Sequence, residues 1–149
     1  MILLLLLLLL SPLTQLFANN PDYEYFQKIH SIPYGTIKDE GHQNPHEMYQ
    51  NNKGDCHDKA IAYADYLHYQ GHKPLIVIRE GLPGCHAYVI VDDWVFDPTL
   101  TPPIYNMTTT DYDLLWRIAS PLGYTTVKQE YKPVYNYEYV LCELMAGDT

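Results

Sequence analysis

A helix with both ends marked lies near the middle of the 149-residue sequence. Asp55 is a good N-cap and Gly71 is a good C-terminal stop, so we expect a helix from Cys56 to about Gln70. Five apolar positions at helical spacing predict one buried face: Cys56, Ala60, Tyr63, Ala64 and Leu67. The first turn of this helix therefore carries a thiol on the side that faces the core.

Segments rich in β-branched and aromatic residues follow this helix and predict strands. They are PLIVI at 74–78, HAYVIV at 86–91, WVFD at 94–97 and, near the C-terminus, YEYVLCEL at 137–144. Helices are expected within 21–30, as one turn around 47–50, and near TTTDYDLLWRIA at 108–119. The pattern predicts an α+β fold in which the central helix packs on an antiparallel sheet of four or five strands.

The pair Asp92-Asp93 predicts a two-residue hairpin turn, because Asp tolerates the positive φ that such a turn requires. Opposed residues in that hairpin have numbers that sum to 185, so Tyr88 faces Asp97. His86 then lies diagonally from Asp97 on the same face, about 7 to 8 Å away at Cα. An imidazole and a carboxylate can meet across that distance.

A thiol at a helix start and a His–Asp pair on one sheet face are the parts of a nucleophilic site. The helix N-terminus favours the Cys56 thiolate, His86 can act as base and then acid, and Asp97 can orient the imidazole. The backbone N–H of Cys56 can donate to an oxyanion. Asp55 and Asp58 would oppose the thiolate unless their carboxylates cap the helix.

The segment from residue 45 to residue 99 resembles the transglutaminase-like superfamily of papain-related cysteine enzymes. The shared features are Gly-Asp-Cys with an acidic residue two positions after the cysteine, a helix closed by Gly, a His opening a strand, and Asp-Pro-Thr closing the next strand. The resemblance implies a papain-like core in which Cys56 is the nucleophile, His86 the base and Asp97 its orienter. It implies a mechanism more directly than a substrate.

Two features depart from the family pattern. Cys85 stands before the family histidine, and no tryptophan precedes the nucleophile as a second oxyanion donor, since the two tryptophans are Trp94 and Trp116. Gln43 or Gln50 is a candidate for that donor.

We expect a hydrolase that cleaves a peptide or amide bond through a thioester on Cys56. Acyl transfer to an amine is the alternative reaction, but shielding a thioester from water takes extra structure, and one domain of this size offers little. A catalytically inactive peptide-binding module is a third possibility.

Each candidate residue also has an ordinary structural interpretation. Cys56 can be a small buried hydrophobe, His86 a strand histidine, and Asp97 the cap of a turn. His57 and Asp58 are expected to be solvated or capping residues. The remaining histidines show no paired spacing and are expected at the surface: His30, His42, His46, His68 and His72.

A zinc site is a rival interpretation, because the sequence contains the pairs Cys56-His57 and Cys85-His86. Neighbouring residues on a strand point to opposite faces, so Cys85 and His86 cannot both reach one ion without a bulge. We therefore expect no metal and no cofactor.

The first 18 residues contain an unbroken apolar run and no charged side chain, which predicts a signal peptide or a signal anchor, followed by one domain at 19–149. The protein is thus expected to be secreted or membrane-anchored outside the cytoplasm. Export makes a disulfide between Cys85 and Cys142 a reasonable expectation. The net charge of -9 argues against nucleic acid as a partner, and a membrane is expected only through an uncleaved N-terminal segment.

Overall fold

The computed structural model describes residues 21–37, 41–81 and 84–133. Within them the helices are α2 (Pro21–Ser31), α3 (Pro45–Asn51), α4 (Cys56–Tyr69) and α5 (Thr109–Ala119). The strands are β1 (Leu75–Gly81), β2 (Gly84–Val91), β3 (Trp94–Asp97), β4 (Ile104–Thr108) and β5 (Tyr124–Glu130). They form one antiparallel sheet in the order β4-β3-β2-β1-β5. The predicted α+β fold is confirmed.

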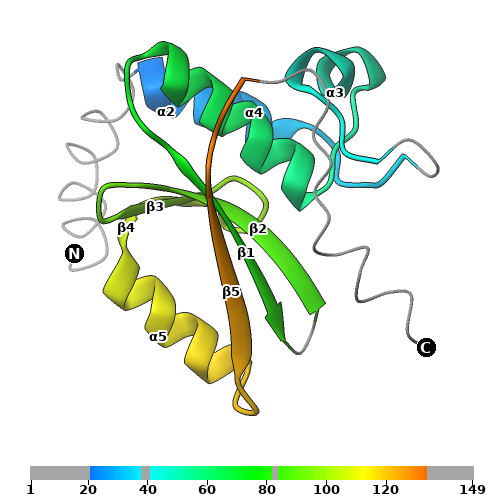
Figure 1. Ribbon diagram of the computed structural model, residues 1–149. Coiled ribbons are helices and arrows are strands. Elements are labelled where there is room, and N and C mark those ends of the chain that lie inside the picture. Colours follow the sequence, from blue (N-terminus) through cyan, green and yellow to red (C-terminus); the bar gives the residue numbers. More distant parts are fainter. Residues whose placement is uncertain (1–20, 38–40, 82–83, 134–149) are drawn as a thin grey trace, which may run out of the picture.

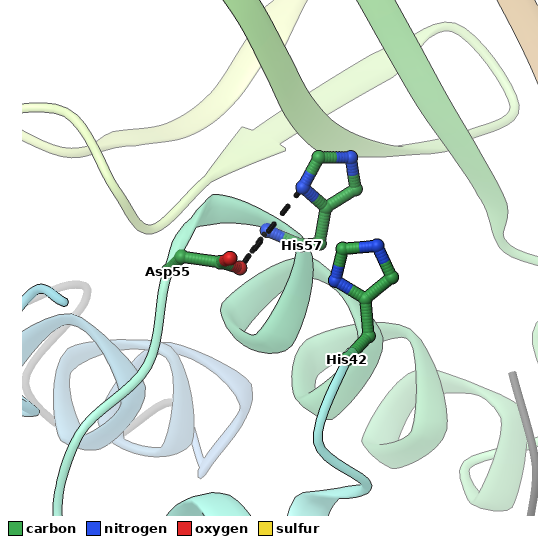
Figure 2. Close-up of side chains that lie close together, drawn as sticks. All are labelled: His42, Asp55 and His57. Carbon is green, nitrogen blue, oxygen red and sulfur yellow. Dashed lines mark hydrogen bonds and ion pairs between the residues drawn. The ribbon is translucent and has the colours of Figure 1, made fainter. Parts of the chain in front are cut away.

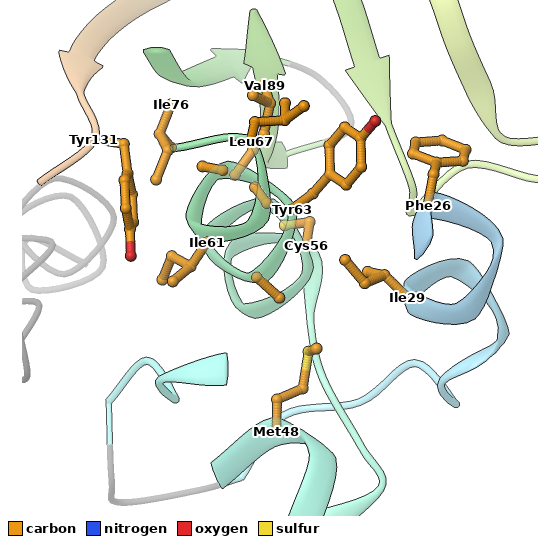
Figure 3. Packing of buried hydrophobic residues seen from close by; sticks show 14 of the residues in the cluster. Phe26, Ile29, Met48, Cys56, Ile61, Tyr63, Leu67, Ile76, Val89 and Tyr131 are labelled. Carbon is orange, nitrogen blue, oxygen red and sulfur yellow. The ribbon is translucent and has the colours of Figure 1, made fainter. Parts of the chain in front are cut away.

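The central helix forms where its end signals predict it. Asp55 caps the N-terminus in a capping box with Asp58, and α4 ends at Tyr69 before Gly71, whose φ of 90° only glycine adopts readily. Its apolar side chains pack against the sheet and α2, as Figure 3 shows for Tyr63, Leu67 and their neighbours. The buried face carries all five residues predicted for it.

The sheet has a helix layer on each face, with α2 and α4 on one side and α5 on the other (Figure 1). Side chains alternate along β2, so Ala87 and Val89 pack in the α4 cluster, and Tyr88 and Ile90 pack in the α5 cluster. His86 has the parity of the α5 face. It stands near the start of β2, so it lies at one end of the sheet.

The hairpin between β2 and β3 has the predicted register. Val89 pairs with Phe96, Ile90 with Val95, and Val91 with Trp94, and Asp92 has a φ of 53°. Each pair sums to 185, so the β2–β3 geometry that was expected to bring His86 toward Asp97 is confirmed.

Two strands were not predicted. β5 runs along the exposed edge of β1 with almost every side chain in solvent, so its sequence lacks the alternation that marks a half-buried strand. β4 follows a proline-rich loop and pairs with β3 through an irregular register. The predicted strand at 137–144 lies outside the described residues.

Among the residues described, no helix is long and apolar enough to span a membrane. Residues 1–18 lie outside that part of the chain, so the N-terminal segment stays a prediction.

Candidate active site

Cys56 is the first residue of α4, and its side chain is a buried free thiol. Gly54, two residues before the thiol, allows the chain to pack closely here, since a Cβ there would lie 2.7 Å from the Sδ atom of buried Met48. The Gly-Asp-Cys sequence therefore has a steric basis: glycine lets the chain enter the helix beside α3, and Asp55 then caps it.

The carboxylates on either side of the thiol are occupied by hydrogen bonds. Asp55 Oδ1 accepts from the backbone N–H groups of His57 (2.9 Å) and Asp58 (3.0 Å). Asp58 accepts from the backbone N–H of Asp55 (3.1 Å) and from both the backbone and side-chain nitrogens of Gln43 (2.8 Å each). Both negative charges are thus directed into the cap, which is the condition under which the thiolate can form.

Two imidazoles favour the thiolate form of Cys56. Burial raises the pKa of the thiol, but hydrogen bonds and positive charge from His57 and His86 lower it by more, to about 6. The sulfur is therefore anionic at neutral pH, in the reactive form of a cysteine.

His86 lies between the thiol and a buried carboxylate. Its Nε2 atom is 2.6 Å from Oδ2 of Asp97, a fully buried residue. Burial lowers the pKa of His86, whereas the hydrogen bonds to Asp97 and Cys56 and their charges raise it, to about 10. Cys56, His86 and Asp97 are thus brought together as a chain of three interacting groups.

The carboxylate of Asp97 is held by two further donors. The backbone N–H of Thr99 donates to Oδ1 at 3.0 Å, and the hydroxyl of Tyr112 donates to Oδ2 at 2.5 Å. Tyr112 comes from α5, which the sequence predicts as a helix without linking it to the site. These hydrogen bonds fix the orientation of the Asp97 carboxylate, which accepts through both of its oxygens.

His57 was predicted to be a solvated or capping residue, and that prediction is wrong. Its side chain is buried, and its Nδ1 atom lies 3.6 Å from the Cys56 sulfur. Burial lowers the pKa of His57, but the hydrogen bond and negative charge of Cys56 raise it by more. The thiol thus has a second imidazole beside it, supplied by the next residue of the same helical turn.

His42 was expected at the surface but is half-buried against His57. The two rings stack with centroids 4.4 Å apart, and the Asp55 carboxylate lies 4.0 Å from His57 Nδ1 (Figure 2). Polar atoms of His42, Asp55 and His57 lie within 4.8 Å of one another, so this cluster holds groups that could bind a cation. Helix capping by Asp55 and the stacked rings account for the cluster without an ion.

His30 was also expected at the surface but is half-buried, and its Nδ1 atom lies 2.8 Å from the carbonyl oxygen of Pro98. This contact joins α2 to the loop that follows Asp97. His46 and His72 are exposed, as predicted.

Neither glutamine is placed to donate to an oxyanion. Gln43 Nε2 donates to the Lys53 carbonyl and to Asp58, and its Oε1 accepts from Asn51, so its side chain is fully engaged. Gln50 is exposed on α3. The prediction for Gln43 is therefore wrong.

A tyrosine beside the thiol was missed by the sequence analysis. Tyr34 pairs with Gly54 in an isolated parallel bridge, which sets it next to the start of α4, and its side chain lies near enough to Cys56 for the two groups to interact. Burial, followed by the negative charges of Cys56 and Asp55, raises the pKa of Tyr34. The hydroxyl therefore keeps its proton at neutral pH and is available as a donor.

Helix α5 is fixed to the sheet by a buried arginine. Arg79 on β1 forms an ion pair with Asp113, and its guanidinium lies over the rings of four aromatic residues at 4.8 to 5.9 Å: Tyr88, Tyr112, Trp116 and Tyr124. These contacts hold the helix in the place from which Tyr112 reaches Asp97.

Cys85 is disulfide-bonded and Cys56 is a free thiol, as predicted, but the predicted partner, Cys142, lies outside the described residues. The choice of Cys142 as the partner stays a prediction.

Comparison with known proteins gives partial structural similarities. No family model and no curated protein matches the chain. LapG of Legionella pneumophila is similar at 18% identity and a TM-score of 0.44, over 60% of this chain and 61% of LapG. The EGTA-treated form of LapG is 17% identical with a TM-score of 0.47, over 65% of this chain and 61% of LapG. The calcium-bound form is 16% identical with a TM-score of 0.45, over 65% of this chain and 63% of LapG. The chain thus spans less than two thirds of each LapG chain.

Proposed function

We propose that the protein is a transglutaminase-like cysteine peptidase or amidase, which cleaves a peptide or amide bond through a thioester on Cys56. The observation that carries this proposal is the continuous contact from a thiolate through His86 to the buried Asp97. A buried cysteine with a purely structural role has no reason to be paired with two imidazoles and a carboxylate.

The reaction follows from this geometry. The Cys56 thiolate attacks the carbonyl carbon of the scissile amide, and the C=O electrons move onto oxygen. The backbone N–H of Cys56 and the Tyr34 hydroxyl donate hydrogen bonds to that oxyanion. As the C–N bond breaks, protonated His86 gives its proton to the departing nitrogen, which leaves as the free amine.

Neutral His86 then acts as the base for the second half of the reaction. It takes a proton from a water molecule, the hydroxide attacks the thioester carbonyl, and a second oxyanion forms. Collapse of this intermediate releases the carboxylic acid and restores the thiolate and the imidazolium. Asp97 accepts a hydrogen bond from the imidazole throughout and exchanges no proton.

Export is part of the proposal. Residues 1–18 are assigned as a signal peptide or signal anchor, and residues 19–149 as the catalytic domain, acting on a peptide or protein outside the cytoplasm. The apolar run supports this location, and the acidic net charge argues against a nucleic-acid partner.

The experiment offers the purified protein an activated acyl donor with a millimolar primary amine and follows the products by mass. A hydrolase gives a transient acyl adduct on Cys56 and free acid as the main product. An amine adduct that forms faster than the acid, and disappears in Cys56→Ala, identifies a transferase instead. A binding module gives neither product and no adduct.

A further inference from the structure

An apolar cavity lies against His86 on the α5 side of the sheet. It has a volume of about 210 Å³, and the described residues that line it are His86, Leu100, Tyr112, Leu115, Trp116 and Ala119. Cys56 is not among them, because it belongs to α4, which packs on the opposite face (Figure 1). The cavity therefore has the imidazole as a wall on the α5 side of the sheet, whereas the thiol belongs to the α4 side.

The position of the cavity indicates which side of the scissile bond it would contact. In amide cleavage the proton passes from the general acid to the leaving nitrogen, so that nitrogen lies on the imidazole side of the attacked carbon. A cavity that has the same imidazole as a wall, on the opposite side of the sheet from the thiol, is placed for the group attached to that nitrogen.

We infer that this cavity binds an apolar side chain on the amine side of the scissile bond, an inference that rests on the proposed function. The substrate class is a peptide in which the residue after the cleaved bond is of leucine, methionine or phenylalanine type. The cavity has room for one such side chain.

The chemistry of the walls disfavours a cationic side chain. The nearest ionised groups already have partners: Arg79 is paired with Asp113 beneath Trp116, and Asp97 accepts from His86, Tyr112 and Thr99. A lysine side chain entering the cavity would lose water and meet no free carboxylate, because Asp97 and Asp113 are already engaged, which is unfavourable.

The mouth of the cavity is itself apolar and open. Leu100 and Leu115 are large apolar side chains that remain exposed there. A substrate side chain seated between them would remove apolar surface from water on both partners, which favours binding.

The inference is tested by partitioning of the thioester between water and added amines. The amine that attacks a thioester occupies the place that the leaving amine vacated, by microscopic reversibility. The protein receives an acetylglycine thioester as donor, with leucinamide, glycinamide or lysinamide at equal concentration, and the ratio of amide product to free acid is measured. Leucinamide should exceed glycinamide by about tenfold, and lysinamide should not exceed glycinamide.

Substitutions on α5 then test whether the cavity is the cause of the leucinamide preference. Leu115→Ala should reduce the leucinamide preference, and Ala119→Phe, which fills the cavity, should abolish it. Leu114→Ala is the matched control, because Leu114 is 57% exposed on the same helix and does not line the cavity. Far-ultraviolet circular dichroism and the melting temperature establish that each variant is folded.

The outcomes separate this inference from the function on which it rests. Equal partitioning to all three amines, with the Cys56 adduct still forming, overturns the cavity assignment and leaves the hydrolase intact. A leucinamide preference that Leu114→Ala removes as strongly as Leu115→Ala also overturns the assignment. Absence of any adduct on Cys56 overturns the proposed function itself, and the cavity assignment falls with it.

Discussion

Tyr112 donates a hydrogen bond to the same Asp97 oxygen, Oδ2, that contacts His86. The phenol and the imidazole thus compete for one atom of a buried carboxylate. Each hydrogen bond reduces the electron density that the carboxylate offers to the other partner. The tyrosine therefore acts on the histidine through Asp97, without contacting the reacting atoms.

Replacing Tyr112 with Phe should alter the pH dependence of the reaction. Loss of the phenol donor leaves Asp97 a stronger acceptor for the imidazolium, so the pKa of His86 rises and the alkaline limb of the kcat/KM profile moves to higher pH. Turnover should fall severalfold because the carboxylate is less firmly held. The measurement is kcat/KM from pH 5 to 11.

Tyr88→Phe is the control for this substitution. Tyr88 is buried next to Tyr112, and its hydroxyl has no hydrogen-bond partner in the described part of the chain. Removal of the Tyr88 hydroxyl should leave the pH dependence of kcat/KM unchanged. An alkaline limb that moves equally in both variants would show that packing, and not the hydrogen bond to Asp97, controls the titration.

Cys56 should react with iodoacetamide at a pH where ordinary thiols do not. Because its pKa is lowered to about 6, the thiolate is present above that pH and is lost as the pH falls through it. A free thiol near pKa 8.5 is at most a few per cent ionised at pH 7. The labelling rate at pH 7 should therefore exceed that of a model thiol by about tenfold, and His86→Ala should reduce this advantage, with the remainder due to His57.

The exposed His72 provides the control, since His72→Ala changes the histidine count without approaching the thiol. Equal labelling of Cys56 in the wild type and in His86→Ala would contradict the ion pair.

The two imidazoles beside Cys56 should differ in their effect on turnover. His57→Gln removes one source of thiolate stabilisation but leaves the general acid, so we expect a loss of about tenfold. His86→Gln removes the group that transfers the proton, so we expect a loss of about a thousandfold. The comparison requires kcat/KM together with the labelling rate of each variant. A greater loss from His57→Gln than from His86→Gln would exchange the two roles.

Breaking the Arg79–Asp113 pair should destabilise the fold. Asp113→Asn leaves the buried guanidinium without its carboxylate, at a cost of about 2 kcal/mol in the free energy of unfolding. The cost is below that of a fully buried pair because the Asp113 side chain is 42% exposed. Urea denaturation measures it, with Asp93→Asn in the exposed turn as the control. The double variant Arg79→Met/Asp113→Asn should recover part of the loss, and failure to recover any would show that the cost lies elsewhere.

The elements that were predicted from the sequence have local signals. The Asp55 cap and the Gly71 stop define α4, and the two-residue turn at Asp92 defines the register that was expected to bring His86 and Asp97 together. These features depend on residues close in the chain, so a single sequence contains the information.

The residues that were missed depend on contacts between distant segments. Tyr34 reaches the thiol through its pairing with Gly54, and His42 through stacking on His57; neither contact follows a periodic pattern. Strand β5 presents its side chains to solvent, so its place in the sheet follows from backbone pairing with β1 and leaves little trace in hydrophobicity.

Helix α5 both supports the catalytic groups and lines the cavity, and this matters for redesign of the enzyme. Tyr112 and Trp116 contact Asp97, His86 and Arg79, whereas Leu115 and Ala119 line the cavity with apolar side chains. A library restricted to positions 115 and 119 would explore new leaving-group preferences while keeping the proton-transfer groups in place. A library that also varied positions 112 or 116 would change the selectivity but lower the reaction rate, since those substitutions would remove contacts that hold the His86 imidazole in place.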